Sequence, residues 1–238
     1  MTQPETVLQA RIDQTRTEVA RLHAELVRYG LVVWTAGNVS GRVPGTDLFV
    51  IKPSGVSYED LAPETMILCD LDGNAIPDAP GSERSPSSDT AAHAYVYRHM
   101  LEVGGVVHTH SDYATAWAAR REPIPCVLTM IADEFGGEIP VGPFALIGDD
   151  SIGRGIVETL RGSRSRAVLM ANHGPFTVGV TATDAVMVED VARTVHFARQ
   201  LGEPTPIAQP DIDALYARYQ NVYGQAGDDR RPEEKEEP

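Results

Sequence analysis

The chain has 238 residues, a mass of 25.8 kDa and a formal net charge of −14, from 34 acidic and 20 basic side chains. Nucleic-acid phosphates and anionic lipid would repel so acidic a protein, which argues against nucleic-acid and membrane partners. Two cysteines, Cys69 and Cys126, exclude a disulfide framework and fit a reducing compartment, so the cytoplasm is the expected location. No apolar run approaches the roughly 18 residues of a membrane span, and the N-terminus lacks a signal-peptide pattern.

The first part of the chain predicts one long helix followed by strands. Apolar residues recur at helical spacing from Leu8 to Leu26, and Gly30 is suited to end that helix. β-rich segments then predict strands at 38–43, 48–52 and 66–71. Asp72-Gly73 supplies a hairpin turn after the third of these strands.

The second part alternates helices with strands. Ser88 or Asp89 can cap a helix that runs to about Leu101. Further strands are expected at 106–110 and 167–171, and further helices at 112–120, 150–160, 188–199 and 212–222. Because several strands follow one another near the N-terminus, the sequence predicts a mixed sheet with helices on its faces rather than a doubly wound parallel sheet.

The length predicts a single α/β domain over residues 1–226. Residues 227–238 read GDDRRPEEKEEP and contain no apolar residue larger than proline. Such a segment cannot bury enough surface to offset its ordering entropy, so a disordered tail is expected. An acidic interaction tail is the alternative.

The strongest local motif is Gly105-Val106-Val107-His108-Thr109-His110. Side chains alternate across a strand, so His108 and His110 are expected on the same face, where two imidazoles can reach one metal ion. An isolated pair of this kind is more often two polar residues at the wet end of a strand. A third histidine in a similar setting makes a metal site the favoured interpretation.

That histidine is His173, which follows the apolar run at 167–171 and precedes Gly174-Pro175. These two residues are expected to end the strand and leave His173 at a sheet edge. Three histidines at strand ends can form a catalytic zinc site with one open position, whereas a turn histidine bonded to the backbone is the alternative. Surface or core packing is the expected role of His23, His99 and His196. His93 lies four residues after Asp89 on the same helical face and competes for the ligand role, but it is not assigned as a ligand.

Two clusters of small polar residues are suited to hold an anion. Lys52-Pro53-Ser54-Gly55 follows a strand, and Ser85-Pro86-Ser87-Ser88-Asp89 opens a helix, where hydroxyl and backbone N–H groups can bind a phosphate. A tight turn and simple helix capping are the alternatives. Gly37-Asn38 is a weaker signal of the same kind. No P-loop, no GxGxxG after a strand and no GxSxG elbow occurs, which argues against a nicotinamide cofactor and a serine hydrolase.

Taken in order, these motifs make the chain resemble the class II aldolase/adducin family and, within it, the L-ribulose-5-phosphate 4-epimerases. The resemblance extends over about residues 5–225 and is carried by the stretches TAGNVS (35–40), VIKPSGV (50–56), PSSDT (86–90), VVHTHS (106–111), HGPF (173–176) and YGQ (223–225). Ile131 departs from the pattern, because the epimerases carry a histidine there.

The resemblance implies a three-layer α/β/α fold with a mostly antiparallel sheet, and a homotetramer with active sites at subunit interfaces. It implies a zinc site at Asp89, His108, His110 and His173. It also implies substrate and phosphate binding by Gly37, Asn38, Ser54, Gly55, Ser87 and Ser88, and an acid/base pair formed by Asp133 and Tyr223. Manganese or cobalt could replace zinc in such an imidazole-rich site.

Because sugar-phosphate aldolases of this family typically carry Glu at the position of Asp89, the aspartate favours epimerisation of L-ribulose 5-phosphate to D-xylulose 5-phosphate. The proton on C4 of a ketopentose phosphate is too far from the C2 carbonyl to be acidic, and the missing dinucleotide motif argues against oxidation and re-reduction. The route to epimerisation that remains is cleavage and re-formation of the C3–C4 bond. The alternatives are an L-fuculose-phosphate-type aldolase that releases its aldehyde, a dehydratase, and a non-catalytic adducin-like scaffold.

Overall fold

The computed structural model describes residues 3–77, 79–180 and 188–221. Its centre is a seven-stranded sheet in the order β3-β2-β1-β4-β7-β6-β5, in which all neighbouring pairs are antiparallel except β5 with β6. The strands are β1 (Asn38–Arg42), β2 (Leu48–Ile51), β3 (Ile67–Asp70), β4 (Gly105–His108), β5 (Val141–Gly142), β6 (Ala167–Met170) and β7 (Gly174–Gly179).

The described residues form seven α-helices and two short 3₁₀ helices. They are α1 (Gln3–Arg28), α2 (Thr90–His99), α3 (Asp112–Arg120), α4 (Thr129–Phe135), α5 (Ser151–Leu160), α6 (Val188–Leu201) and α7 (Gln209–Asn221), with 3₁₀ turns at Tyr58–Asp60 and Pro63–Thr65. None of these helices is long and apolar enough to cross a lipid bilayer.

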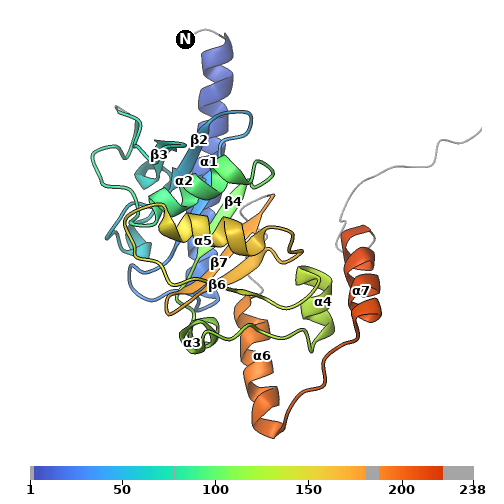
Figure 1. Cartoon of the computed structure of the whole chain (residues 1–238). Coiled ribbons are helices and arrows are strands. Elements are labelled where there is room, and N and C mark those ends of the chain that lie inside the picture. Colours follow the sequence, from blue (N-terminus) through green and yellow to red (C-terminus); the bar gives the residue numbers. More distant parts are fainter. Residues whose placement is uncertain (1–2, 78, 181–187, 222–238) are drawn as a thin grey trace, which may run out of the picture.

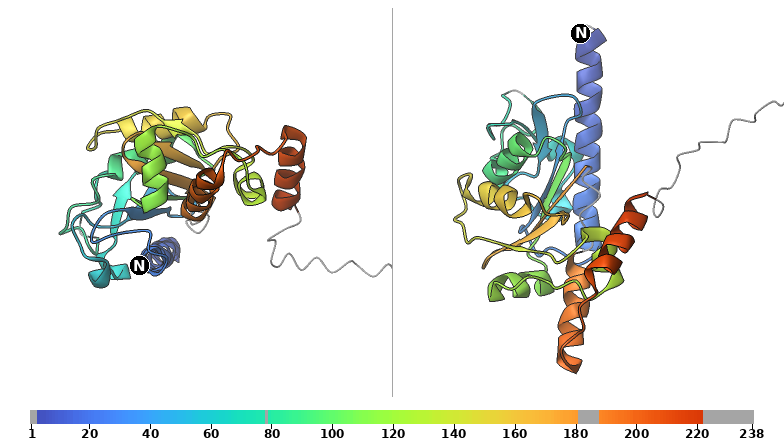
Figure 2. Two further views of the ribbon diagram at one scale, coloured as in Figure 1. Left: turned by 90° about the horizontal axis from the view of Figure 1, so that it is seen from below. Right: turned by 45° about the vertical axis from the view of Figure 1, so that its right-hand side comes forward.

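Alternate strand residues point to opposite faces of the sheet, and each face is covered by helices. On β6, Val168 and Met170 pack with α2 and α5, whereas Ala167 and Leu169 pack into the cluster that includes α3 and α6. Helix α1 covers β1 and β2 on the same face as α6, as the end-on view in Figure 2 shows. This is the expected three-layer α/β/α arrangement around a mixed, mostly antiparallel sheet.

The expected elements occur with shifts of a few residues at their ends. Two expectations about the second part of the chain were wrong: the strand expected at 106–110 ends at His108, and Gly174-Pro175 begin β7 rather than end a strand. Pro175 is tolerated in this central strand because it stands next to the strand's start, where a missing N–H removes little pairing. Helix α4 and strands β5 and β7 were not anticipated. The domain boundary at 226 and the tail 227–238 lie outside the described residues.

Candidate metal centre

The first two histidines meet at the end of β4. His108 is the last residue of β4, and His110 lies two residues beyond it, so regular strand alternation does not place the second ring. The chain nevertheless folds the two imidazoles together, with their Nε2 atoms 3.0 Å apart. The predicted convergence of His108 and His110 is therefore present, although the backbone that produces it is a loop.

The third histidine reaches the same place from the β6–β7 turn. Asn172 adopts a left-handed conformation (φ 58°), and the backbone N–H of His173 donates to the carbonyl of Met170 over 3.0 Å, which closes a tight turn. The His173 ring centroid lies 4.6 Å from that of His108 and 5.1 Å from that of His110. A turn between two strands, rather than a strand end, thus positions this side chain.

One ligand atom from each of these three histidines lies within 4.8 Å of the others. Burial, together with the neighbouring imidazoles, holds the pKa of His108 well below its ordinary value. Burial also lowers the pKa values of His110 and His173, while Asp89 opposes the shift. The rings are therefore neutral at pH 7, which is the protonation state that a metal requires.

The hydrogen-bonding pattern fits a metal as well. His108 Nδ1 contacts the carbonyl of Pro175 at 3.0 Å, and because a carbonyl can only accept, Nδ1 carries the proton. The Nε2 atom of neutral His108 then has a free lone pair that faces His110. An imidazole held in one tautomer by a backbone carbonyl is typical of metal ligands. Three converging imidazoles match the donor set of a catalytic zinc site.

Asp89 lies beside the three histidines but outside their 4.8 Å set. It is the N-cap residue of α2, yet its side chain caps nothing. Instead, Oδ2 accepts a 2.8 Å hydrogen bond from Nδ2 of Asn38, while Oδ1 is buried without a partner among the described residues. A buried carboxylate oxygen left free next to neutral imidazoles is suited to a cation or a hydroxyl donor. Its role as a metal ligand stays a prediction.

The predicted anion-binding segments come together next to the histidines. Asn38 stands opposite His108 in the β1–β4 pairing, and its Nδ2 also donates to Ser87 Oγ over 3.1 Å. Two backbone hydrogen bonds join the other segments, from Ser54 N to Ser85 O at 2.9 Å and from Ser87 N to Lys52 O at 3.0 Å. Gly37, Gly55 and Ser88 lie in the same three loops. The three segments are therefore joined by hydrogen bonds, and their role in binding an anion stays a prediction.

Lys52 is more deeply placed than its motif suggested. The residue is 2% exposed, and its Nζ donates to the carbonyls of Thr35 and Pro53, at 3.1 and 3.3 Å. The face of the Tyr58 ring lies 5.3 Å away, and burial lowers the pKa of the ammonium group. The sequence signal was its position directly after the apolar strand β2.

Asp133, one of the two predicted acid/base residues, does not contact the three histidines within the described part of the chain. Asp133 lies on α4, which packs against α7 (Figure 1), and none of the described contacts joins it to the three histidines. Its Oδ1 atom is buried without a partner in the described part of the chain. Tyr223 lies outside the described residues.

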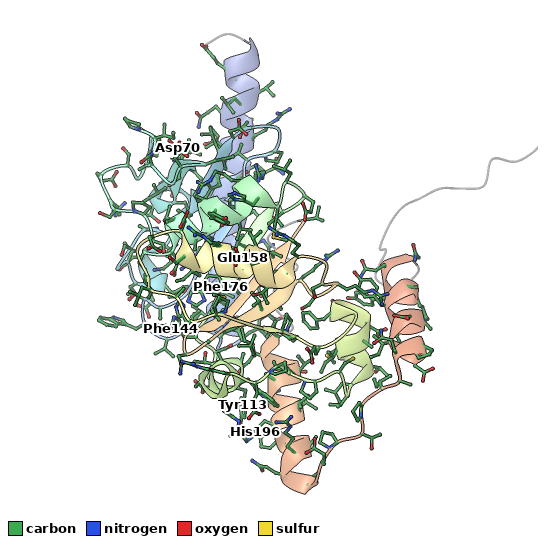
Figure 3. All side chains as sticks on the ribbon, in the orientation of Figure 1. Asp70, Tyr113, Phe144, Glu158, Phe176 and His196 are labelled. Atoms are coloured by element: carbon green, nitrogen blue, oxygen red, sulfur yellow. The ribbon has the colours of Figure 1, made fainter. Side chains whose placement is uncertain are left out.

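The other histidines have structural partners, as expected. His93 is buried with its Nδ1 2.7 Å from Ser40 Oγ, and His23 accepts from the backbone N–H of Val39. The ring of His99 stacks on Tyr95, and His196 packs against Tyr113, a pair that Figure 3 labels. Within the described ranges none of them joins the metal-binding group.

A cavity lies elsewhere in the described chain. It has a volume of about 560 Å³ and is lined by the ends of α2, α5 and β7 together with Arg161, Arg164 and Arg166. The cavity lies at the end of the sheet where β6 begins, and His173 lies at the opposite end, after β6. None of the three histidines lines this cavity.

The chain is an α/β protein with a three-layer fold, and three of its histidines converge where they could hold one metal ion. A family model described as Class II Aldolase and Adducin N-terminal domain matches residues 17–196. The chain belongs to this family, as the sequence predicted. A closer relation to the 4-epimerases stays a prediction.

Solved structures of similar fold carry related descriptions. An L-fuculose 1-phosphate aldolase is 26% identical with a TM-score of 0.79, and the match covers 87% of this chain and 96% of that one. YgbL from Klebsiella pneumoniae, described as a putative aldolase/epimerase/decarboxylase, is 27% identical with a TM-score of 0.72, over 86% and 98% of the two chains. The L-fuculose-1-phosphate aldolase from Thermus thermophilus is 26% identical with a TM-score of 0.64, over 82% and 99%.

Proposed function

We propose that this protein is a divalent-metal-dependent enzyme that cleaves and re-forms the C3–C4 bond of a ketose phosphate. The observation that carries the proposal is the convergence of three neutral imidazoles beside a cradle formed by Asn38, Ser54 and Ser87. A divalent cation held by His108, His110 and His173, with Asp89 adjacent, would act as a Lewis acid toward the negative charge that develops on bond cleavage.

The residues of the chain would supply the remaining requirements. The cradle would bind the substrate phosphate through the hydroxyl groups of its serines, because the backbone N–H groups of Ser54 and Ser87 donate within the cradle, and the buried ammonium group of Lys52 adds positive charge nearby. A base removes the proton of the C4 hydroxyl, the C3–C4 bond breaks, and its electron pair moves to the C2 carbonyl. If the cradle retains the aldehyde while it rotates, re-addition to its other face returns the C4 epimer.

Asp133 and Tyr223 would serve as the acid and base on the two faces of the aldehyde. Since Asp133 has no described contact with the histidines of its own chain, we propose that both residues come from a neighbouring subunit of a homotetramer. An interface site would also leave the histidine cluster open in a single chain. General acid–base groups of this kind typically contribute about 10²–10⁴-fold to the rate.

Two reactions share this chemistry. Asp89 and the motif set favour conversion of L-ribulose 5-phosphate to D-xylulose 5-phosphate, while the similarity to an L-fuculose 1-phosphate aldolase favours release of the aldehyde. The epimerase requires retention of the cleaved fragment, and the aldolase requires its escape. The motifs and the structural similarity thus support different outcomes of one bond cleavage.

The test uses purified protein loaded with zinc, with manganese and cobalt in parallel samples. NMR of a mixture with L-ribulose 5-phosphate would show D-xylulose 5-phosphate if the epimerase proposal holds, and free glycolaldehyde phosphate if the fragment escapes. L-Fuculose 1-phosphate in a second sample tests the aldolase. Metal-loaded, folded protein that converts neither substrate would contradict both proposals.

A further inference from the structure

A buried aromatic residue lies directly against the candidate ligands. Phe176, on β7, is fully buried and stands opposite His108 in the β4–β7 pairing. Its ring is stacked on the His108 imidazole, with centroids 4.0 Å apart and an interplanar angle of 10°, and it meets the His173 ring edge-on at 5.6 Å. Figure 3 shows Phe176 within the body of the molecule, whereas Phe144 projects from its edge.

Two consecutive residues of β7 therefore restrain His108 in different ways. The Pro175 carbonyl accepts from Nδ1 over 3.0 Å, which fixes one edge of the imidazole but still permits rocking about the hydrogen bond. The parallel face of Phe176 opposes that rocking. Together they keep Nε2 directed toward His110, where the two nitrogens are 3.0 Å apart.

Phe176 is itself held from α2 by buried polar groups. The His93 ring meets Phe176 edge-on at 6.2 Å, and His93 Nδ1 lies 2.7 Å from Ser40 Oγ. That hydroxyl lies 2.7 Å from the Tyr97 hydroxyl in turn. His93 and Tyr97 are 0% exposed, so this support is fixed within the core. His93 therefore packs against Phe176 in the core and supports it from α2.

We propose that Phe176 is a positioning residue of the metal centre, whose flat face holds His108 in the orientation in which the three imidazole nitrogens converge. The inference rests on the proposed function, because it requires that the cluster binds a divalent cation. Groups that orient metal ligands typically change metal affinity by about 10–100-fold when they are replaced. The expected consequence is on metal binding itself, before any turnover.

The chain offers a matched control. Phe176→Leu keeps an apolar side chain but removes the flat face, and Phe49→Leu makes the same change in the same core cluster. Phe49 is also fully buried, and the described ring contact that it makes is with Tyr97, at 5.2 Å, and not with any of the three histidines. Both variants should lose comparable thermal stability, so a difference in metal affinity would report on the contact with His108.

The measurement starts from full-length protein stripped of metal by a chelator. Zinc affinity is determined by competition with a chromophoric chelator, and the visible spectrum of the cobalt(II) form reports ligand geometry. Phe176→Leu should bind zinc at least about tenfold more weakly and show an altered cobalt spectrum. Phe49→Leu should retain the affinity and the spectrum of the unmodified chain.

Folded Phe176→Leu with unchanged zinc affinity and an unchanged cobalt spectrum would overturn the proposal, as would an equal loss in Phe49→Leu. If Phe176→Leu does not fold, Phe176→Met, which also lacks a flat face, carries the same expectation. An unmodified chain that binds neither zinc nor cobalt would refute the metal centre and this inference together. Tight binding by the unmodified chain and by the Phe176 variant would refute the role of Phe176 alone.

Discussion

The side-chain amide of Asn38 donates a 2.8 Å hydrogen bond to Oδ2 of Asp89, and this bond ties the start of α2 to the strand next to His108. The other oxygen of Asp89 and Oδ1 of Asn38 are both buried without a partner in the described chain. Two buried acceptors without partners, on residues that are hydrogen-bonded to each other, are costly in a protein interior, but they match a substrate hydroxyl or a cation.

Asn38→Ala should therefore affect both stability and activity. It leaves Asp89 buried without its donor, at a cost of about 1–3 kcal/mol in the free energy of unfolding, and it should lower turnover by more than about tenfold. Denaturant unfolding and initial rates check these effects. The control is Asn74→Ala, because Asn74 makes an exposed 3.2 Å bond to Asp70 in a hairpin turn. Asn74→Ala should leave turnover unaffected. An equal loss of turnover in the two variants would contradict the role of Asn38 in the site.

His108→Gln should remove the bound metal and, with it, the activity. The side chain is buried and supplies the nitrogen nearest to His110, so the two remaining histidines would hold a cation weakly. Metal analysis of purified protein should fall from about one ion per chain to a trace. His99→Gln serves as the control, because His99 bonds to the carbonyl of Tyr95 away from the cluster. Full metal content in His108→Gln would rule out its role as a ligand.

The sequence predicted most of the fold because long periodic segments carry the pattern of their elements. Helix α1 repeats apolar residues over many turns, and Gly30 follows it with φ 66°, as expected of a C-terminal stop. The short elements escaped prediction for the opposite reason. Strand β5 has two residues and α4 has seven, too few for either period to show.

The candidate site was predictable as a set of residues but not as a geometry. His108 and His110 were placed together by strand alternation, yet His110 lies past the end of β4, and the loop that turns its ring back has no simple periodic signal. The role of Phe176 was hidden altogether. Its stacking on His108 depends on the β4–β7 register, and β7 was not expected as a strand.

Gly37→Ala should disturb the site through contact as well as strain. Gly37 has φ 81°, and an added Cβ would lie 2.9 Å from the backbone oxygen of His108. Gly162→Ala is the matched control, because Gly162 has a similar φ of 75° but nothing within 4 Å of an added Cβ. Strain alone should cost about 1 kcal/mol in the control. The Gly37 variant should lose more stability and most of its activity, and equal stability losses would contradict the close contact.

Asp133→Asn should separate acid/base chemistry from metal binding. The substitution nearly preserves the shape of the side chain but removes its ability to accept a proton, so kcat should fall by about 10²–10⁴-fold with metal content unchanged. Asp190→Asn is the control, because that carboxylate forms a surface pair with Arg193. Retention of normal turnover by Asp133→Asn would show that another residue moves the proton.

His23 should make the fold sensitive to acid. Its Nδ1 lies 2.7 Å from the carbonyl of Val19, and Nε2 accepts from the backbone N–H of Val39 at 3.0 Å, so the neutral ring has no room for a second proton. Burial lowers its pKa from 6.5 to about 3. Between these values the unfolded chain binds a proton that the native chain does not. Stability that is fully present above pH 6.5 is therefore lost as the pH falls toward 3, by up to about 1.4 kcal/mol per pH unit.

His23→Gln removes this titration and should flatten the dependence of unfolding free energy on pH by up to about one proton between pH 6.5 and 3. Urea unfolding at pH 7, 6, 5 and 4 measures the slope. Some slope should remain, because burial also lowers the pKa of His93 to about 3. Replacing His23 can lower stability by the same amount at every pH. The readout is therefore the slope of unfolding free energy against pH and not the urea midpoint at one pH. Parallel curves for the variant and the unmodified chain would show that His23 titrates alike in the folded and unfolded states.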